Sequence, residues 1–192
     1  MEPLQAILGA SMGIGLAAAS GFRVFLPPFL MSLWLRFGFL SLEIEGSEFD
    51  FIYSDLCVIM LGVASASEIL AYKIPFLDNA LDAIATPLAG LAGVAVMAVS
   101  LEGLDPSIQW GVAVIAGGGA SLGIQSATVA GRGISSVLTL GIGNPLFSIT
   151  EDIASLFLVL IALVAPLIAL MMTLCLIVYF LKRNKNTVEL KA

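Results

Sequence analysis

The chain has no histidine, and only 11% of its 192 residues are charged. Histidine is the commonest general base and metal ligand, so its absence removes Ser-His catalysis and the usual metal centres. We therefore expect no enzyme activity, no metal and no cofactor. Ordinary soluble domains carry about 25% charged residues. A chain that is 59% hydrophobic, with a mean hydropathy of +1.07, predicts a protein whose solvent is lipid.

Basic residues and cysteines are also scarce. The eight basic residues form no patch that would favour nucleic acid. Cys57 and Cys175 each lie in an apolar run, so we expect two reduced, buried thiols and no metal pair. The N-terminus carries Glu2 and no basic region, unlike a cleaved signal peptide. The expected partners are the lipid bilayer and a small solute or ion, with a homo-oligomer left open.

Apolar runs long enough to cross a bilayer, about 20 residues, recur along the chain. Pro27-Pro28 predict a kink or break in the first run, which is too long for one upright helix, and Pro166 is a candidate kink in the last. Together the runs predict an all-α transmembrane bundle of about six spans with broken helices, forming one domain over residues 1–182. The expected spans cover residues 4–35, 56–72, 80–101, a run from Ile108, a helix or half-helix between Ser126 and Asn144, and 153–181.

The segment from Gly131 to Asp152 is unusual because it lies between apolar runs yet carries four glycines, a proline and several polar side chains. Irregular backbone at membrane depth survives only where protein buries it or where it lines a wet cavity. We therefore predict that Gly141 to Pro145 form a helix break facing the bundle interior. Asp152 is expected to start the next span.

The tail, residues 183–192, together with Lys182, holds half of the basic residues. Positive charge near spans stays in the cytoplasm, so the C-terminus is predicted to lie inside. Counting back through six spans places the N-terminus inside as well. The acidic segments 43–55 and 102–105 then fall outside.

An internal echo relates two helix starts. Pro75 precedes Asp82 by seven residues, and Pro145 precedes Asp152 by seven. Inverted repeats with broken helices recur in transporters, so residues 1–102 and 108–182 are predicted to be three-span halves of opposite orientation. The alternative is two unrelated proline-capped helix starts.

Three stretches resemble the bacterial membrane family called domain of unknown function 4126. They are GLAAASGFRVFLPPF at residues 15–29, the pattern Glu68, Lys73-Ile74-Pro75, Asp78 and Asp82, and Gly-Asn-Pro followed by Glu-Asp at residues 143–152. The resemblance covers about residues 8–170. It implies a multi-pass protein of the bacterial inner membrane and brings no catalytic activity.

Charged side chains inside apolar runs cost at least a few kcal/mol and are therefore the candidate site. The expected lining of a polar pathway, between the first helix and residues 131–152, is Arg23, Glu68, Asp82, Arg132, Asn144 and Asp152. The structural alternatives are a snorkelling Arg23, a Glu68–Lys73 pair, helix capping by Asp82 and Asp152, a cytoplasmic anchor at Arg132 and a turn at Asn144. We further predict that Arg23 is buried and paired with an acid, with Glu68 or Asp82 favoured.

Two functions of different class follow from these patterns. The leading hypothesis is a small-solute or ion transporter, or a channel-like permease. The alternative is a non-transporting membrane scaffold, or a lipid- or partner-binding protein, in which the same charges are structural ion pairs. Stripes of small residues, such as Gly13, Ala17 and Gly21 or Gly90 and Gly93, predict close helix packing.

Overall fold

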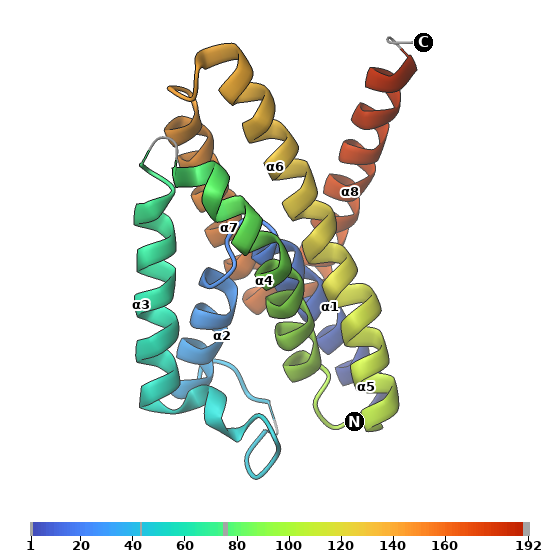
Figure 1. The fold of residues 1–192 in the computed structure, drawn as a ribbon. Coiled ribbons are helices and arrows are strands. Elements are labelled where there is room, and N and C mark those ends of the chain that lie inside the picture. Colours follow the sequence, from blue (N-terminus) through green and yellow to red (C-terminus); the bar gives the residue numbers. More distant parts are fainter. Residues whose placement is uncertain (1, 43, 75–76, 190–192) are drawn as a thin grey trace.

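The computed structural model describes residues 2–42, 44–74 and 77–189, and these ranges form helices joined by turns and loops, without a strand (Figure 1). This confirms the all-α prediction. The elements are α1 (Pro3–Ser20), α2 (Leu26–Arg36), the 3₁₀ turn η1 (Asp50–Tyr53), α3 (Asp55–Ala71), α4 (Leu77–Ser100), α5 (Pro106–Val112), the π-helical segment η2 (Ala113–Gly118), α6 (Gly119–Thr139), α7 (Asn144–Val164) and α8 (Pro166–Glu189).

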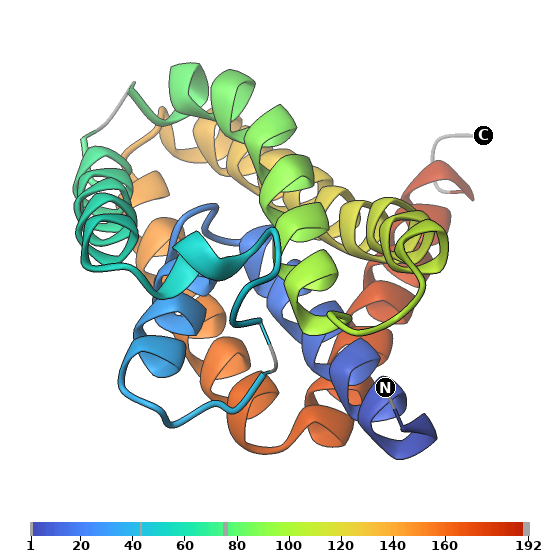
Figure 2. The same cartoon turned by 90° about the horizontal axis from the view of Figure 1, so that it is seen from below.

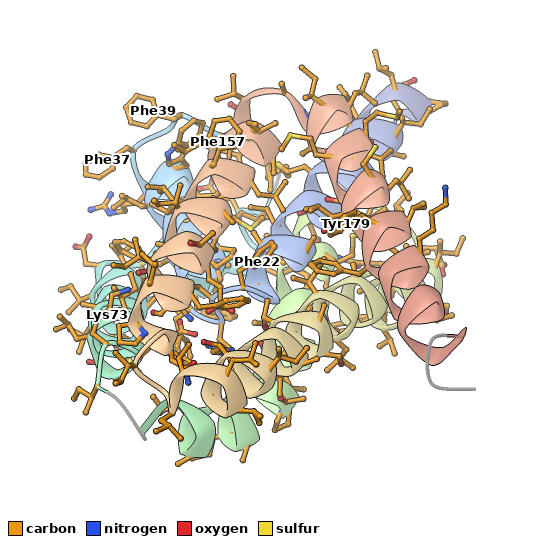
Figure 3. The ribbon with its side chains drawn as sticks, turned by 90° about the horizontal axis from the view of Figure 1, so that it is seen from above. Phe22, Phe37, Phe39, Lys73, Phe157 and Tyr179 are labelled. Atoms are coloured by element: carbon orange, nitrogen blue, oxygen red, sulfur yellow. The ribbon has the colours of Figure 1, made fainter. Side chains whose placement is uncertain are left out.

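Apolar side chains cover the outside of the bundle, which fits a protein that crosses a membrane several times. Four of the described helices are long and apolar enough to span a bilayer, at Pro3–Ser20, Ala80–Ser100, Pro106–Thr139 and Asn144–Val164. Figure 3 shows Phe37, Phe39 and Tyr179 at the rim, whereas Phe22 lies in the interior and is only 9% exposed. Cys57 is half-buried and Cys175 is exposed, so the expectation of a buried thiol is wrong for Cys175.

Helix α1 crosses the middle of the bundle and contacts α4, α6, α7 and α8 (Figure 2). Small residues allow this close approach. A Cβ on Gly13 would lie 2.3 Å from the sulfur of Met97, and one on Gly21 would lie 2.4 Å from the carbonyl oxygen of Ser121. The predicted close packing of small-residue stripes is therefore confirmed at these glycines.

The first apolar run breaks between α1 and α2, as predicted, but a few residues earlier than Pro27. Gly21 ends α1, and α2 starts at Leu26. Pro27 and Pro28 lie in the first turn of α2, where a missing N–H costs no helical hydrogen bond. Helices α1 and α2 form a hairpin. On its other side α2 packs against α3, where Phe29 lies near Gly62.

Two of the expected span boundaries are wrong. Residues 106–139 form one continuous helical rod, α5–η2–α6, instead of two spans. The glycines at 117–119 do not break it, and the local adjustment is the π-helical segment, which lets Gly117 approach the backbone of Gly93. The expected last span divides into α7 and α8 at Ala165, so the candidate kink at Pro166 is confirmed, but as a complete break.

The turn within residues 131–152 forms where predicted but does not face the interior. Leu140 adopts a left-handed φ of 53° and Gly141 a φ of 83°, so the chain reverses between α6 and α7. Leu140 is 80% exposed and Ile142 is 81% exposed, because the turn lies at one end of the bundle. Asp152 lies within α7, not at its start.

The predicted inverted repeat is not confirmed. Helices α4 and α7, whose starts carry the sequence echo, begin at the same end of the bundle (Figure 1). Pro75 itself lies outside the described residues. A shared location of both termini is not confirmed either, since α1 begins at one end of the bundle and α8 ends at the other.

Candidate functional site: a buried charge cluster

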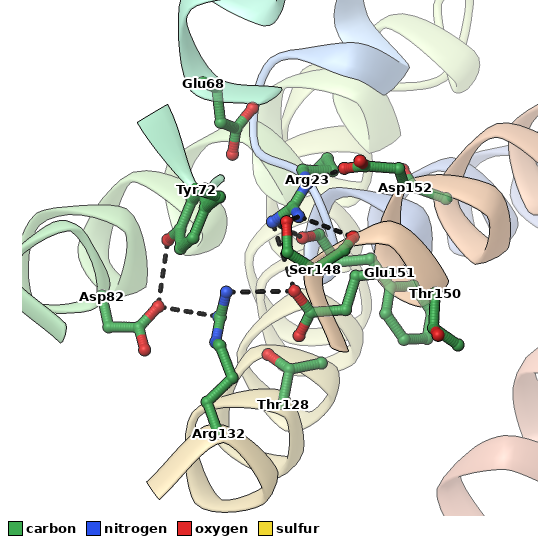
Figure 4. Close-up of polar contacts among 12 residues, drawn as sticks. Arg23, Glu68, Tyr72, Asp82, Thr128, Arg132, Ser148, Thr150, Glu151 and Asp152 are labelled. Atoms are coloured by element: carbon green, nitrogen blue, oxygen red, sulfur yellow. Dashed lines mark hydrogen bonds and ion pairs between the residues drawn. The ribbon is translucent and has the colours of Figure 1, made fainter. Parts of the chain in front are cut away.

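Arg23 lies in the break between α1 and α2, and its side chain is fully buried. Its Nε lies 2.5 Å from Asp152 Oδ1, and its Nη1 lies 3.3 Å from Glu151 Oε2. Its Nη2 donates to the carbonyl oxygen and the Oγ of Ser148, at 2.9 and 2.7 Å. The guanidinium therefore ties the hairpin to one face of α7 (Figure 4).

Arg132, on α6, is the second buried guanidinium and is 1% exposed. Its Nη2 lies 2.7 Å from Asp82 Oδ1, an ion pair by distance in which the N–H is not aligned for a hydrogen bond. Its Nη1 donates to Glu151 Oε2 at 3.0 Å. One carboxylate oxygen of Glu151 thus contacts both arginines and joins α6, α7 and the connection between α1 and α2.

Tyr72 contacts both guanidinium groups. The Cζ atoms of Arg23 and Arg132 are 4.4 and 4.5 Å from the centroid of its ring. A cation is attracted to an aromatic face at such distances. The Tyr72 hydroxyl donates to Asp82 Oδ1 at 3.0 Å. The ring therefore attracts both cations, while its hydroxyl joins the same network.

The pair formed by Lys73 and Asp152 is the most accessible part of the site. The Lys73 Nζ donates to Asp152 Oδ2, and also to Ser148 Oγ at 3.0 Å. The two side chains are 31% and 19% exposed, whereas Arg23 and Arg132 are almost inaccessible. Asp152 accordingly connects the enclosed Arg23 to the accessible Lys73.

Glu68 has a different environment from the other acids. Its carboxylate accepts hydrogen bonds from the backbone N–H groups of Val24 and Phe25, at 2.7 and 3.0 Å. These N–H groups lie at the start of α2, where a helix leaves donors unsatisfied and favours negative charge. Glu68 therefore holds the helix break in place.

We use the name charge cluster for Arg23, Tyr72, Lys73, Asp82, Arg132, Glu151 and Asp152. With Glu68 beside it, this part of the molecule holds three basic and four acidic groups, a formal excess of one negative charge. Removing one partner from a buried ion pair leaves an uncompensated charge. The groups therefore depend on one another.

A buried polar stripe on α6 continues from the charge cluster. Ser121, Gln125, Thr128 and Arg132 are each at most 3% exposed, and their spacing places them on one helix face. Apart from Arg132 Nη2, which is ion-paired with Asp82, three atoms here have no hydrogen-bond partner among the described residues: Gln125 Nε2, Arg132 Nε and Glu151 Oε1. Two donors and one acceptor, on buried side chains of the charge cluster and the α6 stripe, thus have no hydrogen-bond partner among the described residues.

Four of the six residues expected to line a pathway do come together. Arg23, Asp82, Arg132 and Asp152 belong to the charge cluster, and Glu68 lies beside it. Asn144 instead joins the two ends of the α6–α7 turn, where its Nδ2 donates to Ser136 Oγ at 2.7 Å. The expectation that Arg23 is buried and paired is confirmed, but its partners are Asp152 and Glu151, not Glu68 or Asp82.

The ion pairs in the structure decide between several of the structural alternatives. Lys73 pairs with Asp152 and not with Glu68. Arg132 is enclosed and paired with acids, so it is no cytoplasmic anchor. Asp82 and Asp152 bind basic side chains.

Sequence reasoning missed Tyr72, Ser148, Glu151 and the α6 stripe. The available signal was helical spacing, because Glu151 and Asp152 lie three and four residues after Ser148, and Ser155 lies four and three residues after them, which places all four near one helix face. Treating residues 131–152 as irregular backbone concealed that signal.

These features define a multi-pass helical membrane protein with a charge cluster enclosed among its helices. Residues 10–183 match the family described as Domain of unknown function (DUF4126), so the chain belongs to that family. No curated protein and no solved structure matches the chain.

Proposed function

We propose that the protein is a small permease whose pathway passes between the α1–α2 break and α7. The observation that carries this proposal is the charge cluster itself. Arginine and acid side chains within a membrane domain are costly and characteristically mark ion or substrate pathways. Lipid-facing helices can be held together by small-residue packing alone, which α1 and α4 already use at Gly13.

The transported species that best fits the cluster is a proton or another small cation. The formal excess of one negative charge favours a cation over an anion. The half-accessible Lys73–Asp152 pair gives an entrance to the cluster. The α6 stripe then offers open hydrogen-bonding atoms that continue from Arg132 towards Gln125. The proposed route thus runs from the accessible Lys73–Asp152 pair, through the charge cluster, to the buried polar groups of α6.

A non-transporting scaffold is the second candidate, and a specific observation favours it. Both buried arginines have carboxylate partners within 3.3 Å, as expected if the charges only hold the helices together. In a scaffold, Arg23 and Arg132 would keep the same carboxylate partners at all times. A flux measurement separates the two candidates, because a static network needs no transport.

The experiment uses purified protein in liposomes that contain a pH-sensitive dye, with a potassium diffusion potential as the driving force. We expect wild type to carry protons faster than empty liposomes, and Asp152→Asn to lower the rate at least tenfold. A parallel assay with Na⁺ or K⁺ flux covers other small cations.

The matched control is Asp55→Asn, the same chemical change on an exposed carboxylate. Asp55 is 76% exposed and pairs with Arg36 at the far end of α3. This variant should transport like wild type. If wild-type protein moves neither protons nor alkali cations, the permease proposal fails and the scaffold becomes the better account.

A further inference from the structure

A cavity of about 490 Å³ lies at the other end of the bundle, away from the charge cluster. It is enclosed by the first half of α1, residues 40–42, the α4–α5 turn and the junction of α7 with α8. Figure 2 views the molecule from this end. Its size is within the range of ordinary small-molecule sites, roughly 300–1,000 Å³.

The walls of the cavity are mainly apolar, with one carboxylate. Leu8, Met12, Leu42 and Leu163 provide hydrophobic surface, and Glu102 is the acidic residue in the lining. Pockets for small molecules usually combine apolar walls with a few placed polar groups. A ligand that fits this cavity therefore needs an apolar body and one group complementary to a carboxylate.

Glu102 is held in a fixed position by a buried amide. The Nε2 of Gln109, a residue only 3% exposed, donates to Glu102 Oε2 at 2.9 Å and to the carbonyl oxygen of Ala98 at 2.8 Å. The other carboxylate oxygen, Oε1, has no hydrogen bond within the described part of the chain. One charged oxygen thus remains available beside the apolar walls.

The electrostatic surroundings favour a positive ligand. The segments that form this end, residues 37–54 and 101–105, contain several acids and no lysine or arginine. Arg36 lies next to them but is paired with Asp55 at 2.7 Å. A cleft rimmed by charge of one sign raises the local concentration of ligands of the opposite sign.

We infer that this cavity binds a small organic cation with an apolar body, whose ammonium group lies against Glu102. Leu8, Met12 and Leu163 would surround the apolar part. The site is separate from the charge cluster and does not depend on the proposed transport. Equilibrium binding tests it, so its failure and the failure of the permease proposal are distinguishable.

The test measures binding of phenyltrimethylammonium to the purified full-length protein by isothermal titration calorimetry. Glu102→Gln removes the charge, and Leu8→Trp fills the cavity. Each should weaken binding at least tenfold. The matched controls are Glu45→Gln, which removes an exposed acid at the same end, and Leu4→Trp, which adds the same ring to an exposed position of α1. Both should remain within twofold of wild type.

Three results would overturn the inference. The first is no binding of the probe to wild type. The second is binding to Glu102→Gln as tight as to wild type, and the third is a loss of binding in Glu45→Gln as large as in Glu102→Gln. The second result identifies an apolar cavity for lipid chains, and the third a general surface-charge effect. Thermal unfolding of each variant checks the fold, and Glu102→Gln decides the outcome if Leu8→Trp does not fold.

Discussion

At the scale of single residues, the organising interactions are those of two arginines that share one tyrosine. Arg23 and Arg132 both lie within 4.5 Å of the centroid of the Tyr72 ring, and both contact the same oxygen of Glu151. Like charges at such proximity are tolerable because acids surround them on the remaining sides. Because the two guanidinium groups share Glu151 and Tyr72, the position of each one constrains the position of the other.

Replacing Arg132 by methionine should destabilise the protein strongly. The change leaves Asp82 and Glu151 without a buried cation, which costs about 3–5 kcal/mol in comparable pairs. Arg36→Met is the control, because Arg36 pairs with an exposed Asp55 and surface pairs contribute little. The free energy of unfolding in mixed micelles measures both. Equal stability of the two variants would contradict a structural role for the buried pair.

Tyr72 allows the ring and the hydroxyl to be separated. Tyr72→Phe removes only the hydrogen bond to Asp82 and should cost about 1 kcal/mol. Tyr72→Leu also removes the aromatic ring that contacts Arg23 and Arg132 and should cost roughly 1–2 kcal/mol more. The same unfolding assay compares the two variants. If phenylalanine and leucine are equally costly, the stacking contributes nothing measurable.

Burial and pairing of Arg23 could be predicted from the sequence, since a guanidinium in an apolar run needs a partner. The identity of the partner could not. Glu68 is nearer in sequence than Asp152, but it is engaged by the free N–H groups of Val24 and Phe25. That competition arises from the exact position of the helix break, which the prolines located only approximately.

At the scale of helices, close packing is set by glycines at specific contacts and not by glycine content. A Cβ on Gly93 would lie 2.6 Å from the carbonyl oxygen of Gly117, and one on Gly117 would lie 2.5 Å from that of Gly93. Gly119, two residues further, faces open space. Glycine content alone predicts that the whole run Gly117-Gly118-Gly119 packs closely, yet a helix turns about 100° per residue, so only part of the run faces α4.

Gly93→Ala and Gly119→Ala form a matched pair of variants. Gly93→Ala forces α4 away from the π-helical segment and should lower the thermal unfolding temperature. Gly119→Ala has room for its methyl group and gains up to about 1 kcal/mol of helix propensity, so it should be neutral or stabilising. A stable Gly93→Ala protein would show that α4 and the π-helical segment are not in rigid contact.

At the scale of the whole molecule, helix number and direction were harder to predict than the presence of helices. Hydropathy identifies apolar runs reliably because the membrane demands them. It does not reveal that residues 106–139 continue through three glycines, or that the last run reverses at Ala165. The start of α1 and the end of α8 consequently lie at opposite ends of the bundle.

This arrangement predicts an orientation that differs from the one with both termini inside. The basic tail favours a cytoplasmic end of α8, so the α6–α7 turn should be cytoplasmic, and the start of α1 should be outside with the acidic segment. A protein lacking Cys57 and Cys175 can carry a single cysteine at Gln5, Ser47 or Ile142. A membrane-impermeant maleimide should label the first two in intact cells and the third only after permeabilisation. Labelling of Ser47 with protection of Gln5 would restore the arrangement with both termini inside, and labelling of Ile142 alone would reverse the whole orientation.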